Sequence, residues 1–305
     1  MRHLLKFIYF IITKIFSGKK LTGKYPILFK FKLFLISKIK STTAIVGTHR
    51  MYLDSLDSLN LSVSSLYDPL TTSLVKKIVR EGDTVIDVGA NIGYYTLIFA
   101  QLVGRSGRVF AFEPDPVNYS ILTKNIETNK YNNVIPTEKA LADYNGKTEI
   151  HLSIENNGDH RLFYSESDRE RKLVEVIKLD DFHFPENFSK EIKLIKMDVQ
   201  GSEYRVLKGM DDTLKKSSKV KYLICEFSPF LLKPAGAAPQ DFIDLILNFG
   251  FQLYDIDETT PFIKKQNIEA LIKKYDADKP LYTNLLCVHK TIEDEMRLLL
   301  KDYLC

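Results

Sequence analysis

Residues 84–93, TVIDVGANIG, constrain the fold more than any other stretch of this chain. The run 85–88 is rich in Val and Ile and predicts a short buried strand. Gly89 permits the sharp turn that follows, and apolar residues recur at helical spacing over 92–102, which places Gly93 at a helix start. Free amides there favour polar or anionic ligand groups. The stretch is either a ligand-binding loop or a plain connection between a strand and a helix.

A second apolar run, residues 108–112, ends in Glu113. Open parallel sheets bind ligands outside the carboxyl ends of their strands, and an acid about 20 residues beyond the glycine turn commonly bonds ribose hydroxyls. Glu113 lies 24 residues after Gly89. The alternative is a helix cap or a solvated turn acid. We assign ribose binding to Glu113 and capping to Asp115, which precedes Pro116 and the next helical pattern.

The glycine spacing does not support a dinucleotide cofactor. The fingerprint for NAD or FAD is GxGxxG, whereas this loop reads GANIG. Another adenosine cofactor is therefore needed.

Three stretches in order carry a family resemblance: VIDVGANIGYYT (85–96), VFAFEPDPVNY (109–119) and LIKMDVQGSEYRVLKGM (194–210). Over roughly residues 70–290 the chain resembles the FkbM-type family of S-adenosylmethionine-dependent methyltransferases. The resemblance implies an α/β fold with a Rossmann-like, seven-stranded class I methyltransferase sheet and helices on both faces. It also implies an activity that is usually O-methylation of a small molecule or glycan.

The resemblance further implies which residues hold S-adenosylmethionine. The loop 87–93 would hold its amino acid portion, Glu113 its ribose, and residues 140–143 would flank its adenine. The cofactor-binding residues expected in this way are Asp87, Gly89, Ala90, Asn91, Gly93, Glu113, Pro114, Leu141, Ala142 and Asp198.

The resemblance also implies that the fourth strand ends at the reaction centre, which here points to Asp198. Methyl transfer to a hydroxyl needs a group that removes the hydroxyl proton, and a carboxylate suits that task. Asp198 is the better base candidate, whereas Glu203 is either a second catalytic acid or a helix-start acid that satisfies backbone amides. The family's usual DVEG motif is DVQG here, so Gln200 departs from it.

A divalent metal would find oxygen ligands in Asp198, Glu203 and Glu226. The neutral Gln200 weakens this interpretation, and no metal is expected.

Two polar clusters follow other strands and are expected near the acceptor. Residues 156–161 include His160, an alternative base or a partner for an acidic group because histidine titrates near neutrality. A solvated loop histidine is the structural alternative. Arg161 from this loop and Glu226, expected in a loop after a strand over 222–225, are candidate substrate contacts. Glu226 is otherwise a hydrogen-bonded structural acid.

The remaining pattern predicts a doubly wound sheet, because strands and helices alternate. Residues 147–179 read as a β-rich excursion, and 252–256 and 283–288 as late strands, an antiparallel pair. The chain is expected to comprise a basic, apolar leader and helical extension (1–69), a catalytic domain (70–290) and a C-terminal amphipathic helix (291–305).

Residues 1–40 are a distinct electrostatic unit. They hold ten Lys and Arg residues and no acid, and since the whole chain carries +4, the remainder carries −6. A spanning helix needs about 20 mostly apolar residues, whereas Lys6 and Lys14 interrupt this run. No small-residue cleavage pattern follows Phe16, which disfavours a signal peptide.

Two interpretations of the leader stay open. It is either a basic amphipathic helix on an anionic membrane surface or a helix packed on the catalytic domain with solvated lysines. Nucleic-acid binding is disfavoured, because Ile and Phe are interleaved with the basic residues and the remainder is acidic.

Cysteine usage is sparse. Cys225 and Cys287 lie in apolar runs and Cys305 ends the chain, which provides neither a disulfide framework nor a metal spacing. A reducing, cytoplasmic location is expected.

The expected function is S-adenosylmethionine-dependent O-methylation of a sugar, glycan, glycolipid or secondary metabolite. One alternative is a noncatalytic cofactor-binding or scaffold protein, which Gln200 favours. Another is an N- or carboxyl-methyltransferase, which would differ in its acceptor pocket.

Overall fold

The computed structural model describes residues 40–153, 156–163, 169–185, 191–215 and 220–305, with scattered positions among residues 1–39. The chain divides into two compact units, Met1–Tyr67 and Asp68–Cys305. The two interpretations of the basic leader therefore concern a segment that lies mostly outside the described residues. Within the described part, no helix has the length and apolar character needed to cross a membrane.

In the first unit, β1 (Thr43–Val46) and β2 (His49–Tyr52) form an antiparallel hairpin. The expected helical extension is wrong for this stretch. Gly47 turns the chain with a φ of +58°, and burial in β2 alternates from one residue to the next, which is the period of a strand.

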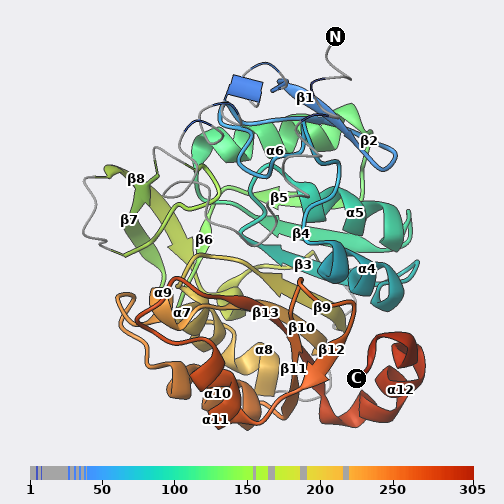
Figure 1. Cartoon of the computed structure of the whole chain (residues 1–305), viewed down its shortest axis with the longest axis vertical. Helices are drawn as coiled ribbons and strands as arrows, with labels where there is room; N and C mark the ends of the chain where they lie inside the picture. Colours follow the sequence, from blue (N-terminus) through green and yellow to red (C-terminus); the bar gives the residue numbers. More distant parts are fainter. Residues whose placement is uncertain are drawn as a thin grey trace. The chain divides into compact units, whose positions relative to one another are not determined.

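A mixed sheet organises the described part of the second unit (Figure 1), with strands in the order β12-β11-β13-β10-β9-β3-β4-β5. The strands are β3 (Thr84–Val88), β4 (Arg108–Phe112), β5 (Val134–Thr137), β9 (Ile192–Met197), β10 (Val220–Phe227), β11 (Phe251–Ile256), β12 (Ile263–Lys265) and β13 (Thr283–His289). The strands from β5 to β10 are parallel, and β13 is antiparallel to both β10 and β11. The predicted seven-stranded sheet and its late antiparallel pair are confirmed, and β12 adds an eighth strand at the edge.

The helices of this unit follow the strands in the predicted alternation. They are α4 (Pro69–Ile78), α5 (Tyr94–Val103), α6 (Pro116–Thr128), α7 (Glu203–Lys208), α8 (Asp211–Lys215), α9 (Pro229–Leu232), α10 (Pro239–Asn248), α11 (Ile268–Lys274) and α12 (Glu293–Leu299), with 3-10 turns η1 (Leu179–Asp181), η2 (Lys290–Ile292) and η3 (Lys301–Tyr303). The C-terminal amphipathic pattern is helical as predicted, and it buries Met296 and Leu300.

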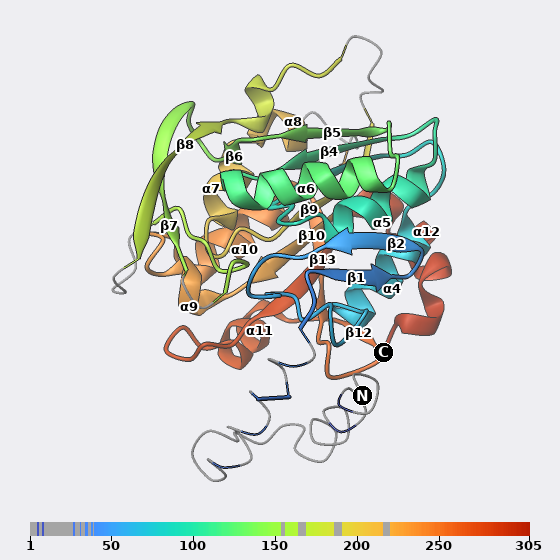
Figure 2. The same cartoon turned by 90° about the horizontal axis from the view of Figure 1, so that it is seen from above.

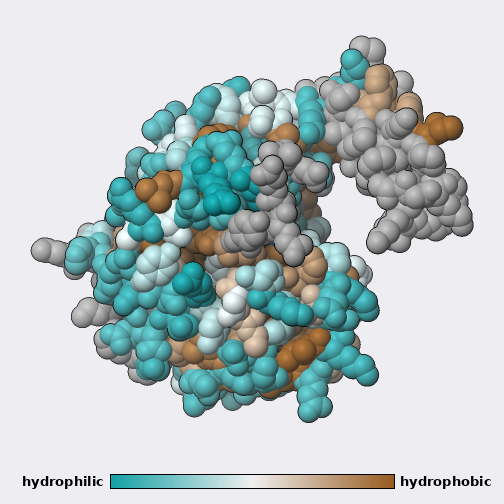
Figure 3. Space-filling view, turned by 90° about the vertical axis from the view of Figure 1, so that its left-hand side faces the viewer, coloured by the Kyte–Doolittle hydropathy of each residue, from teal (hydrophilic) through white to brown (hydrophobic). Residues whose placement is uncertain are grey.

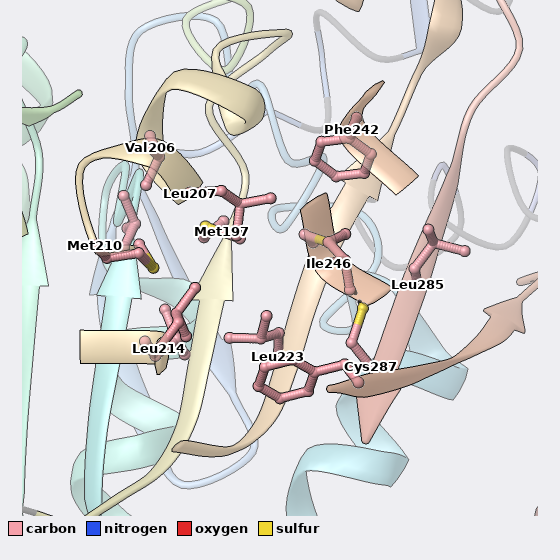
Figure 4. Close-up of a cluster of buried hydrophobic side chains, with 14 of the residues drawn as sticks. Met197, Val206, Leu207, Met210, Leu214, Leu223, Phe242, Ile246, Leu285 and Cys287 are labelled. Atoms are coloured by element: carbon pink, nitrogen blue, oxygen red, sulfur yellow. Dashed lines mark hydrogen bonds between the residues drawn. The ribbon is translucent and has the colours of Figure 1, made fainter. Parts of the chain in front are cut away.

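Helices cover both faces of the sheet, as predicted. The Thr96 hydroxyl of α5 donates to the Asp87 side chain over 2.6 Å, so α5 covers the face to which Asp87 points. Successive strand residues point to opposite faces, and the neighbours Ile86 and Val88 accordingly enter a buried cluster with residues of α7, α10 and α11. Figure 4 shows strand side chains facing helix side chains there, with Met197, Leu223, Leu285 and Cys287 against Val206, Leu207, Phe242 and Ile246.

A separate small sheet has the order β6-β8-β7, formed by β6 (Ala140–Leu141), β7 (Gly146–Leu152) and β8 (Glu170–Ile177). It lies to one side of the large sheet, on the left in Figures 1 and 2. The predicted β-rich excursion is confirmed.

Candidate functional site

The carboxyl ends of neighbouring strands bring the candidate residues into one row. β3 pairs with β4 as far as Val88 and Phe112, and with β9 as far as Met197. β10 pairs with β9 as far as Cys225 and Met197. Because paired strands lie about 4.8 Å apart, the residues that come next form a continuous row of Glu113, Gly89, Asp198 and Glu226.

The glycine loop lies directly against the loop after β9. A Cβ atom on Gly89 would be 2.1 Å from the backbone oxygen of Asp198, and Gly89 has a φ of +76°. Only glycine fits both the space and the conformation. Gly93 is the N-cap residue of α5, and a Cβ there would be 2.8 Å from Leu122 of α6. The predicted strand, turn and helix are thus confirmed.

Glu113 holds the glycine loop through its side chain. Its Oε2 accepts a hydrogen bond from the Asn91 N–H over 2.8 Å, and its Oε1 accepts one from the Asp115 N–H over 3.0 Å. Burial raises the pKa of Glu113 to about 8, and the carboxylates of Asp115 and Asp87 add to this effect. Each carboxylate oxygen keeps a further lone pair for a hydroxyl donor.

Asp115 caps α6, as predicted. It accepts hydrogen bonds from the N–H groups of Val117 and Asn118, over 3.1 and 2.9 Å. Pro116 follows at the first helical position, where its missing N–H costs nothing.

The residues expected to flank adenine follow β5 in the chain. The last residue of β5, Thr137, lies next to Glu113, because its carbonyl accepts a hydrogen bond from the Glu113 N–H. Leu141 packs into the large core cluster, while Ala142 is buried against Gly209 at the end of α7. Asp143 is paired with Arg205 and Lys208 of α7, at 3.3 and 3.4 Å.

Asp198 lies in the middle of the row, with donors on both carboxylate oxygens. The Gln200 side-chain amide donates to Oδ1 over 2.8 Å, and Lys196 Nζ lies 3.4 Å from Oδ2. Gln200 has a φ of +52°, which turns its side chain back toward Asp198. The departure from the family motif thus supplies a donor that a glutamate could not provide.

Lys196 is a buried cation below the row, and no local sequence pattern predicted its role. It is 4 % exposed and pairs in register with Asp87 of β3. Burial alone would lower the pKa of Lys196, but the carboxylates of Asp198, Asp87 and Asp68 outweigh it and raise the pKa. Its ammonium group lies over the Tyr95 ring, 4.7 Å from the centroid.

Asp87 is fully enclosed, and burial raises its pKa. Oδ2 accepts from Thr96, while Oδ1 has no hydrogen-bond partner among the described residues. Asp87 therefore keeps an acceptor free beneath the glycine loop.

Asp68, also absent from the predicted site, precedes α4 with a φ of +42°. Burial raises its pKa to about 7, and the carboxylates of Asp198 and Glu258 contribute. Its role was hidden because an acid before Pro69 reads as a helix cap.

Glu203 is buried, and its Oε1 accepts from the Val199 N–H over 3.0 Å. Burial raises the pKa of Glu203 to about 7, with a further contribution from Asp198. Its carboxyl group thus braces the 199–203 loop.

Glu226 is not in a loop after β10, and that prediction was wrong. The strand continues to Phe227, and Glu226 pairs with Asn284 of β13. The strand continues because Phe227 is fully buried in the core and extends the apolar run beyond the acid.

The loop 156–161 packs on the glycine loop. The Asn118 side chain donates to the Asn157 carbonyl over 3.1 Å, and a Cβ on Gly158 would be 3.3 Å from the Asn91 side chain. His160 accepts from the Ser153 N–H over 3.1 Å, and burial lowers its pKa.

Arg161 is engaged within the same loop. Its Nε lies 2.7 Å from Asp159, whose other oxygen lies 2.6 Å from Arg169. Figure 3 shows this β7–β8 side of the molecule, where hydrophilic residues surround a central area of paler and apolar ones.

Comparison with known proteins gives a consistent result. A family model described as the methyltransferase FkbM domain matches residues 87–253. The hexuronic acid methyltransferase AglP of Haloferax volcanii is 30% identical over 57% of this chain and 65% of its own length. The 2-O-methyltransferase NoeI of Sinorhizobium fredii is 28% identical over 58% of this chain and 76% of its own length. The 31-O-demethyl-FK506 methyltransferase FkbM of Streptomyces tacrolimicus is 29% identical over 44% and 62%. The chain therefore spans slightly less than two thirds of the first and third of these relatives.

Proposed function

Because the chain belongs to the FkbM family of S-adenosylmethionine-dependent methyltransferases, we propose that it transfers a methyl group from this cofactor to a hydroxyl group of a sugar-containing acceptor. The names of the relatives support this acceptor class, since they include a hexuronic acid methyltransferase and a 2-O-methyltransferase.

The residues present fit the cofactor. Glu113 retains acceptor capacity for ribose hydroxyls after accepting from Asn91 and Asp115. The free Oδ1 of Asp87 suits a cationic or hydroxyl donor of the ligand. When bound, S-adenosylmethionine supplies an electrophilic methyl carbon attached to a sulfonium.

One observation carries the proposal: the Asp198 loop touches the glycine loop at Gly89, with Glu113 next in the row. This contact supports a general base beside the cofactor site. In our proposal, the Asp198 carboxylate accepts the proton of the acceptor hydroxyl while that oxygen forms its bond to the methyl carbon. The neutral thioether of the demethylated cofactor would be the leaving group.

The surrounding residues orient this base. Gln200 and Lys196 donate to opposite oxygens of Asp198, which restricts the carboxylate to one orientation. We assign Glu203 to bracing the loop, and the 156–161 segment with His160 and Arg161 to covering the cofactor site. The Gln200 contact weighs against a noncatalytic scaffold, because the Gln200 amide orients the Asp198 carboxylate and leaves it able to accept a proton.

Calorimetric titration with S-adenosylmethionine, with NADH in a parallel cell, tests the cofactor. Transfer of a labelled methyl group to a panel of glycosides then tests the reaction. Binding of NADH instead of S-adenosylmethionine, or binding of neither, would contradict the proposal.

A further inference from the structure

The row of polar residues continues past Asp198 on the side away from the glycine loop. Glu226 of β10 pairs with Asn284 of β13, which in turn pairs with Ile256 of β11. Neighbours in register point to the same face of a sheet. Asp198, Glu226 and Asn284 therefore form a polar strip beside the reaction centre.

Glu226 has unused hydrogen-bonding capacity in this strip. The residue is 7 % exposed, and its Oε1 has no hydrogen-bond partner among the described residues. Burial raises the pKa of Glu226 well above its usual range, and Asp198 and Glu203 contribute. Buried polar atoms normally have partners, so this oxygen points to a ligand group.

Asp68 is a second acid near this strip, and its side chain does not cap the helix that follows it. As the residue before α4 it would be expected to cap the helix, yet its side chain accepts no capping bond. Glu258 does so instead, accepting from the N–H groups of Leu70 and Thr71, each over 2.8 Å. Asn284 donates to Asp68 across 3.4 Å, which ties Asp68 to the strip.

Tyr282 places an aromatic ring beside these acids. The residue is 61% exposed, although it immediately precedes the buried β13. Burial of its hydroxyl and the carboxylates of Glu226, Asp68 and Asp198 raise its pKa. Thr283 pairs with Phe227, the residue after Glu226, so Tyr282 lies at the end of the strip with much of its surface open to solvent.

We propose that Asp68, Glu226, Tyr282 and Asn284 form an acceptor subsite that binds adjacent hydroxyls of an uncharged sugar ring and disfavours a hexuronate. This inference rests on the proposed function. Carboxyl and amide groups pair with sugar hydroxyls as both donors and acceptors, and the exposed ring of Tyr282 offers its face to the apolar side of a pyranose.

The charge of the subsite gives the selectivity. Asn284 connects Asp68 to the strip that contains Asp198 and Glu226, and the nearby cation Lys196 already interacts with Asp198, Asp87 and Asp68. Arg161 and Arg169 are both paired with Asp159. An acceptor carboxylate would add a negative charge beside Asp198, in a cluster where burial and neighbouring carboxylates already raise the pKa values of Asp68 and Glu226, and such juxtaposition is unfavourable.

Saturation-transfer NMR on the full chain with saturating S-adenosylhomocysteine tests the subsite. The probes are p-nitrophenyl β-glucoside and β-galactoside, each against the corresponding uronide. The wild type should prefer each neutral glycoside by at least about tenfold. With all measurements at pH 8, Asp68→Asn should reduce this preference severalfold, because it removes a carboxylate from the cluster. Glu226→Ala and Tyr282→Ala should weaken both classes, while Glu269→Gln on the exposed surface of α11 should change neither.

The possible failures are distinguishable. Absence of S-adenosylmethionine binding in calorimetry contradicts the proposed function itself. Normal cofactor binding with equal or stronger binding of uronides overturns only the subsite. The same holds if no glycoside binds, or if the preference survives unchanged in Asp68→Asn.

Discussion

The backbone oxygen of Asp198 occupies the space that a side chain on Gly89 would need, with only 2.1 Å to an added Cβ. The glycine loop and the loop that carries the proposed base are therefore in direct backbone contact, which the absence of a side chain at Gly89 permits.

Gly89→Ala should accordingly be strongly destabilising. The φ of +76° costs an alanine about 1–2 kcal/mol, and the overlap adds about 1–3 kcal/mol. Gly236 is the matched control, because it has a φ of +87° but nothing within 4 Å of an added Cβ. Urea unfolding of both variants separates the two costs. Equal losses would show that the Asp198 contact contributes nothing.

The sequence was sufficient to predict those parts of the site that depend on local pattern. The β3–α5 unit follows from an apolar run, a glycine turn and helical spacing, and the Asp115 cap follows from its position before Pro116. These features involve residues within one or two turns of each other, so a single sequence displays them.

The site residues that the sequence did not predict correctly owe their positions to contacts between segments far apart in the chain. Asp68 is released from capping by Glu258, which lies 190 positions later in the chain. Lys196 is one of two lysines in β9, and its significance appears only when β3 places Asp87 beside it. Glu226 was misplaced because the strand continues past an acid, and only pairing with β13 reveals that.

Asp198→Asn should abolish turnover while cofactor affinity stays close to that of the wild type. Asparagine keeps the shape and an oxygen for Gln200 but removes the base, and general-base catalysis typically contributes about 10²–10⁴-fold. Labelled methyl transfer and calorimetry provide the two readouts. Asp211→Asn, on the surface helix α8, is the control. Full turnover in Asp198→Asn would remove this residue from the proposed mechanism.

Gln200 variants separate orientation of the base from backbone strain. Gln200→Gly relieves the positive φ of 52° and should hold or raise the melting temperature, yet lose roughly tenfold or more in kcat because a bond to a carboxylate disappears. Gln200→Glu should also lose turnover, since two acids then face each other. Unchanged kcat in both variants would mean that the amide has no part in orienting Asp198.

Lys196→Met should destabilise the fold by about 3–5 kcal/mol at neutral pH, because it leaves buried carboxylates uncompensated. Burial already raises the pKa values of Asp87 and Asp68, the latter to about 7, and loss of the cation raises them further. An acid whose pKa is higher in the folded state than in the unfolded state lowers the free energy of unfolding at pH values where the acid is ionised in the unfolded chain. This loss becomes smaller as the pH falls.

Urea unfolding at pH 5 and pH 8 measures how the loss of unfolding free energy in Lys196→Met depends on pH. The deficit of Lys196→Met relative to the wild type should be smaller at the lower pH. Lys215→Met, an exposed partner of Asp211, should show little deficit at either value. A deficit that is the same at both pH values would contradict the acid cluster.

The pH dependence of cofactor binding provides a test of Glu113. Its pKa in the free protein is raised to about 8, chiefly by burial. Ribose hydroxyls that donate to the carboxylate favour its ionised form, so binding must lower this pKa. Below pH 8 part of the binding free energy is spent on releasing the proton, and affinity should therefore rise with pH and level off above about 8.

Calorimetry with S-adenosylhomocysteine from pH 6 to pH 9 measures this profile directly. The ligand's own amino group also titrates in this range, so the informative quantity is the difference from Glu113→Gln, which has no carboxyl proton to release. Glu113→Gln should bind the ligand more weakly at high pH, and its affinity should rise less steeply with pH than that of the wild type. Glu269→Gln should retain the wild-type profile. Identical profiles in the wild type and Glu113→Gln would show that ionisation of Glu113 is not coupled to the cofactor, and the ribose assignment would then be wrong.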